Sequence, residues 1–196
     1  MILLVAVVAG TIAGWGIARW KRQTWHPPSF QSLWLVFLGF LPQFIVFYLP
    51  VTRQLVTDDL ASLSLVCSQV ILMIFAWKNL HLSGMPVLIF GLGCNLVVIL
   101  VNGGFMPLVA ETAARIVEPH VMDRLVIGAR LGKASKDILL PESHILLPWL
   151  ADRFISPKLS SYRAVYSLGD VFVAVGAFWM LANRHSTTAP SVGDSL

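Results

Sequence analysis

The residues of this chain best suited to chemistry are polar groups that stand beside apolar segments. Asn102, Gly103 and Gly104 end one apolar run, and Asp170 lies three residues after Ser167 at the start of another. Glycine lets another backbone or a ligand approach closely, so an amide beside two glycines can wall a recess. A carboxylate just inside an apolar helix is a default functional candidate. We therefore expect Asn102 and Asp170 to face each other.

The same residues also have a structural interpretation. Two glycines that accept positive φ, followed by Pro107, end a helix sharply, and local chemistry favours this cap over a recess. Ser167 and Asp170 have the spacing of a capping box, with Asp in place of Glu or Gln. A negative charge also suits the N-terminal end of a helix dipole. For Asp170 the sequence leaves capping and binding open, since one residue can do both.

Three amides form a second candidate site. Counted at 1.5 Å per residue from one side of the predicted bundle, Gln43, Gln69 and Asn95 reach a similar height near mid-membrane. An unpaired amide in hydrocarbon costs several kcal/mol, so these side chains are expected to turn inward. They are candidates for a small polar site, although hydrogen bonds between helices, each worth about 1 kcal/mol or less, are the favoured interpretation.

The composition predicts that these groups are carried by an integral membrane protein. Hydrophobic residues make up 57% of the 196 and charged residues only 12%, whereas about 25% of a soluble domain is charged. A spanning helix needs roughly 17–25 apolar residues. Five segments meet this length and are predicted to cross the bilayer: 1–18, 33–49, 60–77, 85–102 and 167–183.

Basic residues set the predicted orientation. Those of the short loops and of the C-terminal end all fall on one side of such a bundle: Arg19, Lys21, Arg22, Lys78 and Arg184. The predicted location is a bacterial cytoplasmic membrane. The positive-inside rule then puts the N-terminus outside the cell and the C-terminus in the cytoplasm.

The predicted fold is all-α, with five transmembrane helices and a partly helical extracytoplasmic cap. Within the cap, 108–119 and 120–132 read as short helices. The expected parts are a four-helix transmembrane part, the cap, the fifth helix and a disordered cytoplasmic tail: 1–102, 103–166, 167–183 and 184–196.

A stripe of small residues marks one face of the first segment. Its members recur every four residues: Ala6, Gly10, Gly14 and Ala18. Small residues let helices approach closely within a membrane. Packing inside the chain is the favoured interpretation, and contact with a second copy or a partner subunit is the alternative.

Two motifs resemble those of a known family. Asn102-Gly103-Gly104-Phe105-Met106-Pro107 and Ser167-Leu168-Gly169-Asp170 are similar to the NGGxMP and SxGD motifs of a family of small bacterial polytopic membrane proteins of unknown function. Leu147-Pro148-Trp149-Leu150-Ala151-Asp152 resembles the Leu/Pro-rich stretch between them. The resemblance implies a fold and a membrane location rather than an activity. It also implies a shared outer-face site: Asn102, Gly103, Gly104, Met106, Pro107, Asp152 and Asp170.

Signatures of enzymes and cofactors are scarce. The sequence has no GxSxG, HExxH, Walker A or dinucleotide-binding fingerprint. The spacing of its acidic residues matches no calcium loop, and its scattered Lys and Arg do not predict nucleic-acid binding. We expect no metal and no cofactor, and an enzyme is the less favoured class. An intramembrane enzyme acting on lipid would need Asp152 and Asp170 in one pocket.

Two functional hypotheses follow. The favoured one is a non-enzymatic accessory or scaffolding subunit of a larger membrane complex, in contact with the bilayer and with other subunits or a second copy. The alternative is a transporter-like protein that binds a small molecule or lipid beneath the cap, near Asn102 and Asp170.

Overall fold

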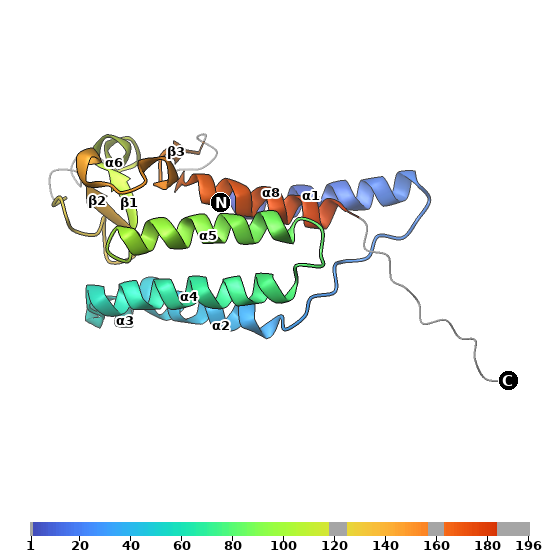
Figure 1. Cartoon of the computed structure of the whole chain (residues 1–196), viewed down its shortest axis with the longest axis horizontal. Coiled ribbons are helices and arrows are strands. Elements are labelled where there is room, and N and C mark those ends of the chain that lie inside the picture. The colour runs from blue at the N-terminus through green and yellow to red at the C-terminus, as the bar shows by residue number, and fades with distance from the viewer. Residues whose placement is uncertain (1, 118–124, 157–162, 184–196) are drawn as a thin grey trace.

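The computed structural model describes residues 2–117, 125–156 and 163–183, and five apolar helices run along its long axis (Figure 1). They coincide, within a few residues, with the five predicted segments. The second consists of α2 and a π-helical turn that continues it. The bounds are α1 Ile2–Trp20, α2 Trp34–Gln43 with Phe44–Tyr48, α4 Asp58–Lys78, α5 Met85–Val101 and α8 Leu168–Ala182.

Two of these helices, α1 and α4, are long and apolar enough to cross a membrane, judged by length and composition. The other three are shorter, at 10–17 residues. Two such helices are a weak indication of a membrane protein. Five crossings go beyond what helix length shows.

The helices pack as a row of neighbours. Helix α1 lies against α8, α8 against α5, α5 against α4, and α4 against α2. The antiparallel helices α5 and α8 approach each other closely, and this contact depends on glycine. A Cβ built on Gly91 would lie 2.5 Å from the carbonyl oxygen of Gly169, and one on Gly176 would lie 2.7 Å from the carbonyl oxygen of Gly84. The contact is thus made by two pairs of glycines, each pair seven residues apart in the chain: Gly84 and Gly91, and Gly169 and Gly176.

This contact gives a matched pair of substitutions. Gly91→Ala should lower the unfolding free energy by about 1–3 kcal/mol, because its methyl group meets the α8 backbone rather than a flexible side chain. Gly93→Ala, two residues away with no heavy atom within 4 Å of the added Cβ, should be neutral or slightly stabilising. Thermal unfolding midpoints in detergent compare the two. Equal midpoints would show that the close α5–α8 contact is not formed.

The small-residue stripe of α1 also packs within the chain. Gly10 and Gly14 are buried, and a Cβ on Gly10 would lie 2.8 Å from the carbonyl oxygen of Phe178 in α8. The indole of Trp25, beside Gly14, donates to the carbonyl oxygen of Leu181 at 3.3 Å. Of the other two members, Ala18 is buried and Ala6 half-buried. Helix α8 therefore covers Gly10 and Gly14 of the stripe.

Short strands correct the all-α prediction. In the segment that follows α5, β1 (Met106–Val109) pairs in parallel with β2 (Asp137–Leu140), and β3 (Phe154–Ile155) pairs antiparallel with β4 (Val165–Tyr166). The glycine turn after α5 delivers the chain in an extended conformation, and Pro107 cannot donate within a helix. The backbone N–H and C=O groups of this extended segment then form hydrogen bonds with a neighbouring extended segment, β2. We call residues 103–117, 125–156 and 163–166 the cap, which lies at one end of the helices (Figure 1).

The helical parts of the cap are brief. Helix α6 (Ala110–Ile116) begins two residues later than the predicted helix over 108–119, because 106–109 forms β1. In the predicted helix over 120–132, residues 125–132 form turns and no helix. A short helix α3 (Pro50–Leu55) and two 3₁₀ turns, Glu142–His144 and Pro148–Leu150, complete the assignment. The predicted tail, 184–196, lies outside the described residues.

A hydrophobic cluster joins the cap to the helices. Phe105 and Met106 pack with Leu150 of the cap and with residues of α4 and α5: Ala61, Leu65, Val98 and Ile99. Met106 is fully buried. The extended segment after α5 is thus fixed to the bundle.

Candidate functional site

Asn102 ties the end of α5 to the cap. Its side-chain N–H group donates to the carbonyl oxygens of Val98 and Leu146, both at 2.8 Å, and its oxygen accepts from the Leu146 backbone N–H at 2.9 Å. Three of its hydrogen-bonding positions are used by backbone, and the side chain is buried. Asn102 therefore has a structural role. The amide that binds Asp170 is that of Asn95.

The glycines after Asn102 form a helix stop. Gly103 and Gly104 have φ of +83° and +86°, and the Gly104 N–H donates to the carbonyl oxygen of Ile99 at 2.8 Å. A Cβ on Gly104 would lie 2.6 Å from that of Ser62 in α4. Gly104 is thus required by its backbone conformation and by a close neighbour, and Gly103 by conformation alone. The local geometry of Gly103 and Gly104 is that of a helix C-terminus rather than of a ligand-binding recess.

Asp170 lies in a polar cluster at the start of α8. Ser167 and Asp170 form a capping box, with the Asp170 N–H donating to Ser167 Oγ at 3.0 Å and the Ser167 N–H donating to Asp170 Oδ2 at 3.1 Å. Asn95 of α5 completes the cluster, since its Nδ2 donates to Asp170 Oδ1 and its Oδ1 accepts from Ser167 Oγ, both at 2.8 Å. Asn95 and Ser167 are buried.

Among the described residues, no hydrogen bond joins the three predicted amides to one another. Asn95 belongs to the Asp170 cluster. Gln43 Nε2 donates to Ser68 Oγ at 2.6 Å, and Ser68 Oγ donates to the carbonyl oxygen of Gly39. Gln69 has a buried Oε1 without a hydrogen-bond partner among the described residues.

Asp152 is fully buried in the cap, where strand β1 holds it. Its backbone N–H donates to the carbonyl oxygen of Pro107 at 3.2 Å. Neither carboxylate oxygen has a hydrogen-bond partner in the described part of the chain, and Lys136 Nζ lies 3.6 Å from Oδ2. Asp137 Oδ1 is likewise buried without a partner, while its Oδ2 accepts from Ser135 Oγ at 2.8 Å. A buried carboxyl group with so few donors favours holding a proton.

Electrostatics agree with this geometry. Burial raises the pKa of Asp152, the Lys136 ammonium lowers it, and the Asp137 and Asp170 carboxylates raise it again, to about 7. Burial lowers the pKa of Lys136, but the attraction of Asp152, Asp170 and Asp137 outweighs burial and raises it. Lys136 therefore stays charged, and Asp152 can take up or release a proton near neutral pH. In the described ranges, no group of three His, Cys, Asp or Glu side chains is placed to hold a metal ion.

A pocket of about 510 Å³ opens beside this cluster. Ile2, Leu3 and Val5 of α1 form one wall, and Tyr166 and Val173, from β4 and α8, contribute to the remainder. Among the described residues of its wall, the charged side chains are those of Lys136 and Asp170. The described part of the wall thus combines apolar side chains with one cationic and one anionic group.

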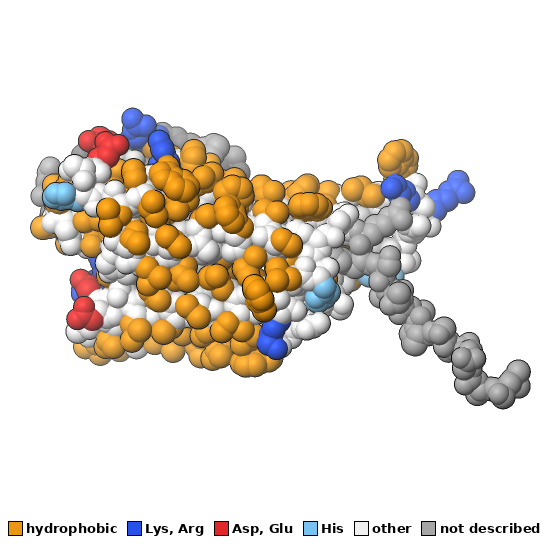
Figure 2. Space-filling model, in the orientation of Figure 1, with side chains coloured by type: hydrophobic (Ala, Val, Ile, Leu, Met, Phe, Trp, Pro, Cys, Tyr) orange, Lys and Arg blue, Asp and Glu red, His pale blue; other side chains and the backbone are white. Residues whose placement is uncertain are grey.

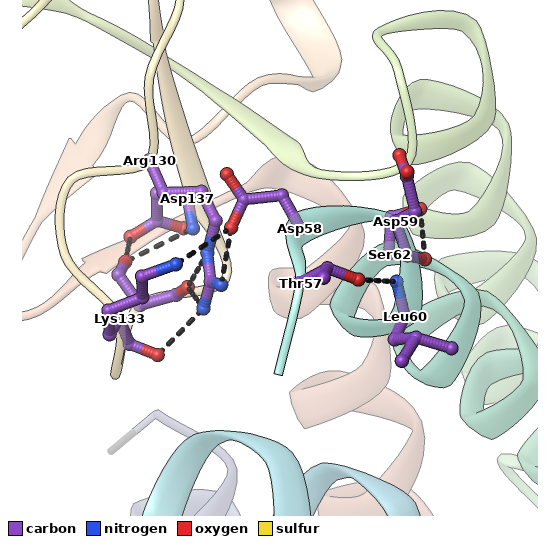
Figure 3. Close-up of polar contacts among 9 residues, drawn as sticks. Thr57, Asp58, Asp59, Leu60, Ser62, Arg130, Lys133 and Asp137 are labelled. Atoms are coloured by element: carbon purple, nitrogen blue, oxygen red, sulfur yellow. Dashed lines mark hydrogen bonds and ion pairs between the residues drawn. The ribbon is translucent and has the colours of Figure 1, made fainter. Parts of the chain in front are cut away.

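Arg130, which sequence reasoning missed, connects the cap to α4 (Figure 3). Its side chain is only 5% exposed, and it donates to Asp58 Oδ1 at 3.1 Å and to the carbonyl oxygen of Lys133 at 2.7 Å. The guanidinium lies 5.1 and 5.2 Å from the ring centroids of Phe47 and Phe105. A single basic residue in a long loop carries no signal that distinguishes it.

Replacing Arg130 tests this connection. Arg130→Ala should lower the unfolding free energy by about 2–4 kcal/mol, because it removes a nearly buried cation with hydrogen bonds and two aromatic contacts. The matched control is Asp58→Asn, which should cost less than about 1 kcal/mol because Asp58 is 55% exposed. Thermal midpoints of the two variants in detergent decide. Similar losses would assign the stabilisation to the exposed ion pair instead.

Comparison with known proteins gives one match. The model of a family described as "Family of unknown function (DUF5317)" matches residues 28–182. This range contains both motifs and Asp152, and α1 precedes it. No curated protein matches the chain, and no solved structure does.

Proposed function

The chain belongs to the DUF5317 family of unknown function, and from this premise we propose that it is a multi-pass membrane protein that binds an amphiphilic small molecule or lipid beneath its cap. In this proposal five helices cross a bacterial cytoplasmic membrane. The cap lies outside, as does the N-terminus, and the C-terminus is cytoplasmic.

The distribution of side chains supports the membrane part of the proposal. Large apolar side chains are exposed along the helices, including Phe37, Phe90 and Trp179. Figure 2 shows hydrophobic side chains spread along the helical part of the face drawn, with charged ones toward its ends. Between residues 60 and 77, and throughout α5, the chain has no charged residue. A bilayer satisfies such a surface, since lipid tails accept apolar side chains.

The pocket is the observation that carries the binding function. Its volume of about 510 Å³ falls within the range of about 300–1,000 Å³ that is usual for small-molecule sites. Leu3 and Val5, on its α1 wall, are 45% and 59% exposed, so an apolar ligand can reach the pocket along a surface that faces lipid tails in our proposal. The charges of Lys136 and Asp170 would orient a polar end.

The accessory-subunit hypothesis receives less support. The stripe of α1 was its most specific argument, and Gly10 and Gly14 are covered by α8. The remaining exposed apolar surface is accounted for by a bilayer. Copurification from native membranes is the measurement for that hypothesis.

Narrowing the pocket tests the binding function. Val5→Trp adds bulk to an exposed position in the pocket wall and should lower the amount of amphiphile that copurifies with the protein several-fold. Ile12→Trp, also on α1 and 62% exposed but not in that wall, should leave it unchanged. Native mass spectrometry from mild detergent measures the bound mass. A wild-type protein without bound amphiphile, or equal occupancy in both variants, would contradict the proposal.

A further inference from the structure

One cationic and one anionic side chain, Lys136 and Asp170, lie in the described wall of the pocket beneath the cap. We propose, as a deepening of the binding function above, that its ligand is a zwitterionic phospholipid whose headgroup ends in a primary ammonium, with the ammonium at Asp170 and the phosphate at Lys136. The source is the surrounding bilayer.

Asp170 has the capacity to accept from an ammonium. Each of its oxygens accepts one of the hydrogen bonds described above, from Asn95 and from the Ser167 backbone, and each carboxylate oxygen has a second lone pair. The side chain is half-buried and lies in the pocket wall. A primary ammonium offers three N–H donors, and hydrogen bonds to charged groups are stronger than neutral ones. A quaternary ammonium has no N–H group.

Lys136 has the capacity to bind a phosphate. Its ammonium has three N–H donors, and the structure pairs it with Asp152 at a single distance of 3.6 Å. Its side chain is 39% exposed and lies in the same pocket wall. A headgroup that carries both charges satisfies Lys136 and Asp170 together.

The surrounding charge disfavours an anionic lipid. Three carboxyl groups, of Asp137, Asp152 and Asp170, act on Lys136, and no second cation is paired with them among the described residues. A headgroup with net negative charge would add to this excess, whereas one with zero net charge would not. The pocket is smaller than a whole phospholipid, so the acyl chains must leave along the exposed α1 wall at Leu3 and Val5.

A methylation series of lipids tests this inference without altering the protein. Purified protein is mixed with phosphatidylethanolamine, its N-methyl and N,N-dimethyl derivatives, phosphatidylcholine and phosphatidylglycerol, all with the same acyl chains, and bound lipid is counted by native mass spectrometry. Binding should fall with each methyl group and be about tenfold lower for phosphatidylcholine than for phosphatidylethanolamine, from the loss of a charge-assisted hydrogen bond. Phosphatidylglycerol should bind no better than phosphatidylcholine.

The Asp170→Asn variant adds a check on the residue. It should lose most of the preference for phosphatidylethanolamine over phosphatidylcholine, and if it does not fold, the methylation series decides alone. Equal binding of all five lipids, or strongest binding of phosphatidylglycerol, would overturn this inference and leave the binding function standing. Absence of any bound lipid would overturn both.

Discussion

Lys136→Met is expected to lower the unfolding free energy by about 3 kcal/mol or more, which is roughly 6–12 °C in the thermal midpoint of a chain this size. The substitution leaves the carboxyl group of Asp152, which is fully buried, without its ion-pair partner. Removing one partner of a buried pair typically costs about 3–5 kcal/mol. Since Lys136 is 39% exposed, the lower end of that range applies.

A second substitution should rescue this variant. Asn at position 152 resembles the protonated form of Asp152 and carries no charge that needs an ion-pair partner. In the Lys136→Met/Asp152→Asn double variant, most of the lost stability should return. The four proteins of this double-mutant cycle are compared by thermal unfolding in detergent at pH 8. Additive losses would show that Lys136 and Asp152 do not interact.

The thermal midpoint is also expected to fall as pH rises from 5 to 8. The pKa of Asp152 in the folded protein is about 7, above its ordinary value of 3.8, so the folded state retains a proton that the unfolded state releases. Stability from this group is therefore greatest at low pH and is lost as pH rises toward 7. At about 1.4 kcal/mol per pKa unit, the loss between pH 5 and 8 is about 2–3 kcal/mol.

Asp152→Asn separates this effect from other titrations. Lys136, whose pKa is raised, stays protonated throughout this pH window and contributes no slope there. The difference in thermal midpoint between wild type and Asp152→Asn should therefore change with pH. The midpoint of the wild type should fall relative to that of Asp152→Asn as pH increases. Parallel pH profiles of the two proteins would mean that Asp152 is ionised across the whole window.

The helices of this fold could be predicted from the sequence, but their packing could not. Apolar runs bounded by charges and by Gly or Pro locate all five helices. The α5–α8 contact uses Gly84, Gly91, Gly169 and Gly176, whose spacing of seven is visible in the sequence. This spacing predicts a close contact only if α5 and α8 are known to be neighbours, and the spacing within either helix does not show that they are. The strands were missed because 106–109 pairs with 137–140, and short non-periodic segments carry no signal for such a partner.

The candidate site was predicted in part. The capping box at Ser167 and Asp170 follows from local spacing and is present. The partner of Asp170 is Asn95 and not Asn102, which lies seven residues further along the chain. The sequence could not distinguish the two amides, because counting residues along α5 does not show at what height α8 begins. Lys136 and Arg130 were missed because a charged loop residue acquires its role only from the fold.

The proposed function depends on a membrane orientation in which the cap faces outward. Single cysteines test this claim most directly, after Cys67 and Cys94 are replaced by serine. Gly132→Cys lies in an exposed turn of the cap, and His81→Cys lies in the exposed α4–α5 connection at the opposite end of the bundle (Figure 1). In right-side-out vesicles, a membrane-impermeant maleimide should label position 132 at once and position 81 only after permeabilisation. Labelling of position 81 alone before permeabilisation would contradict the account.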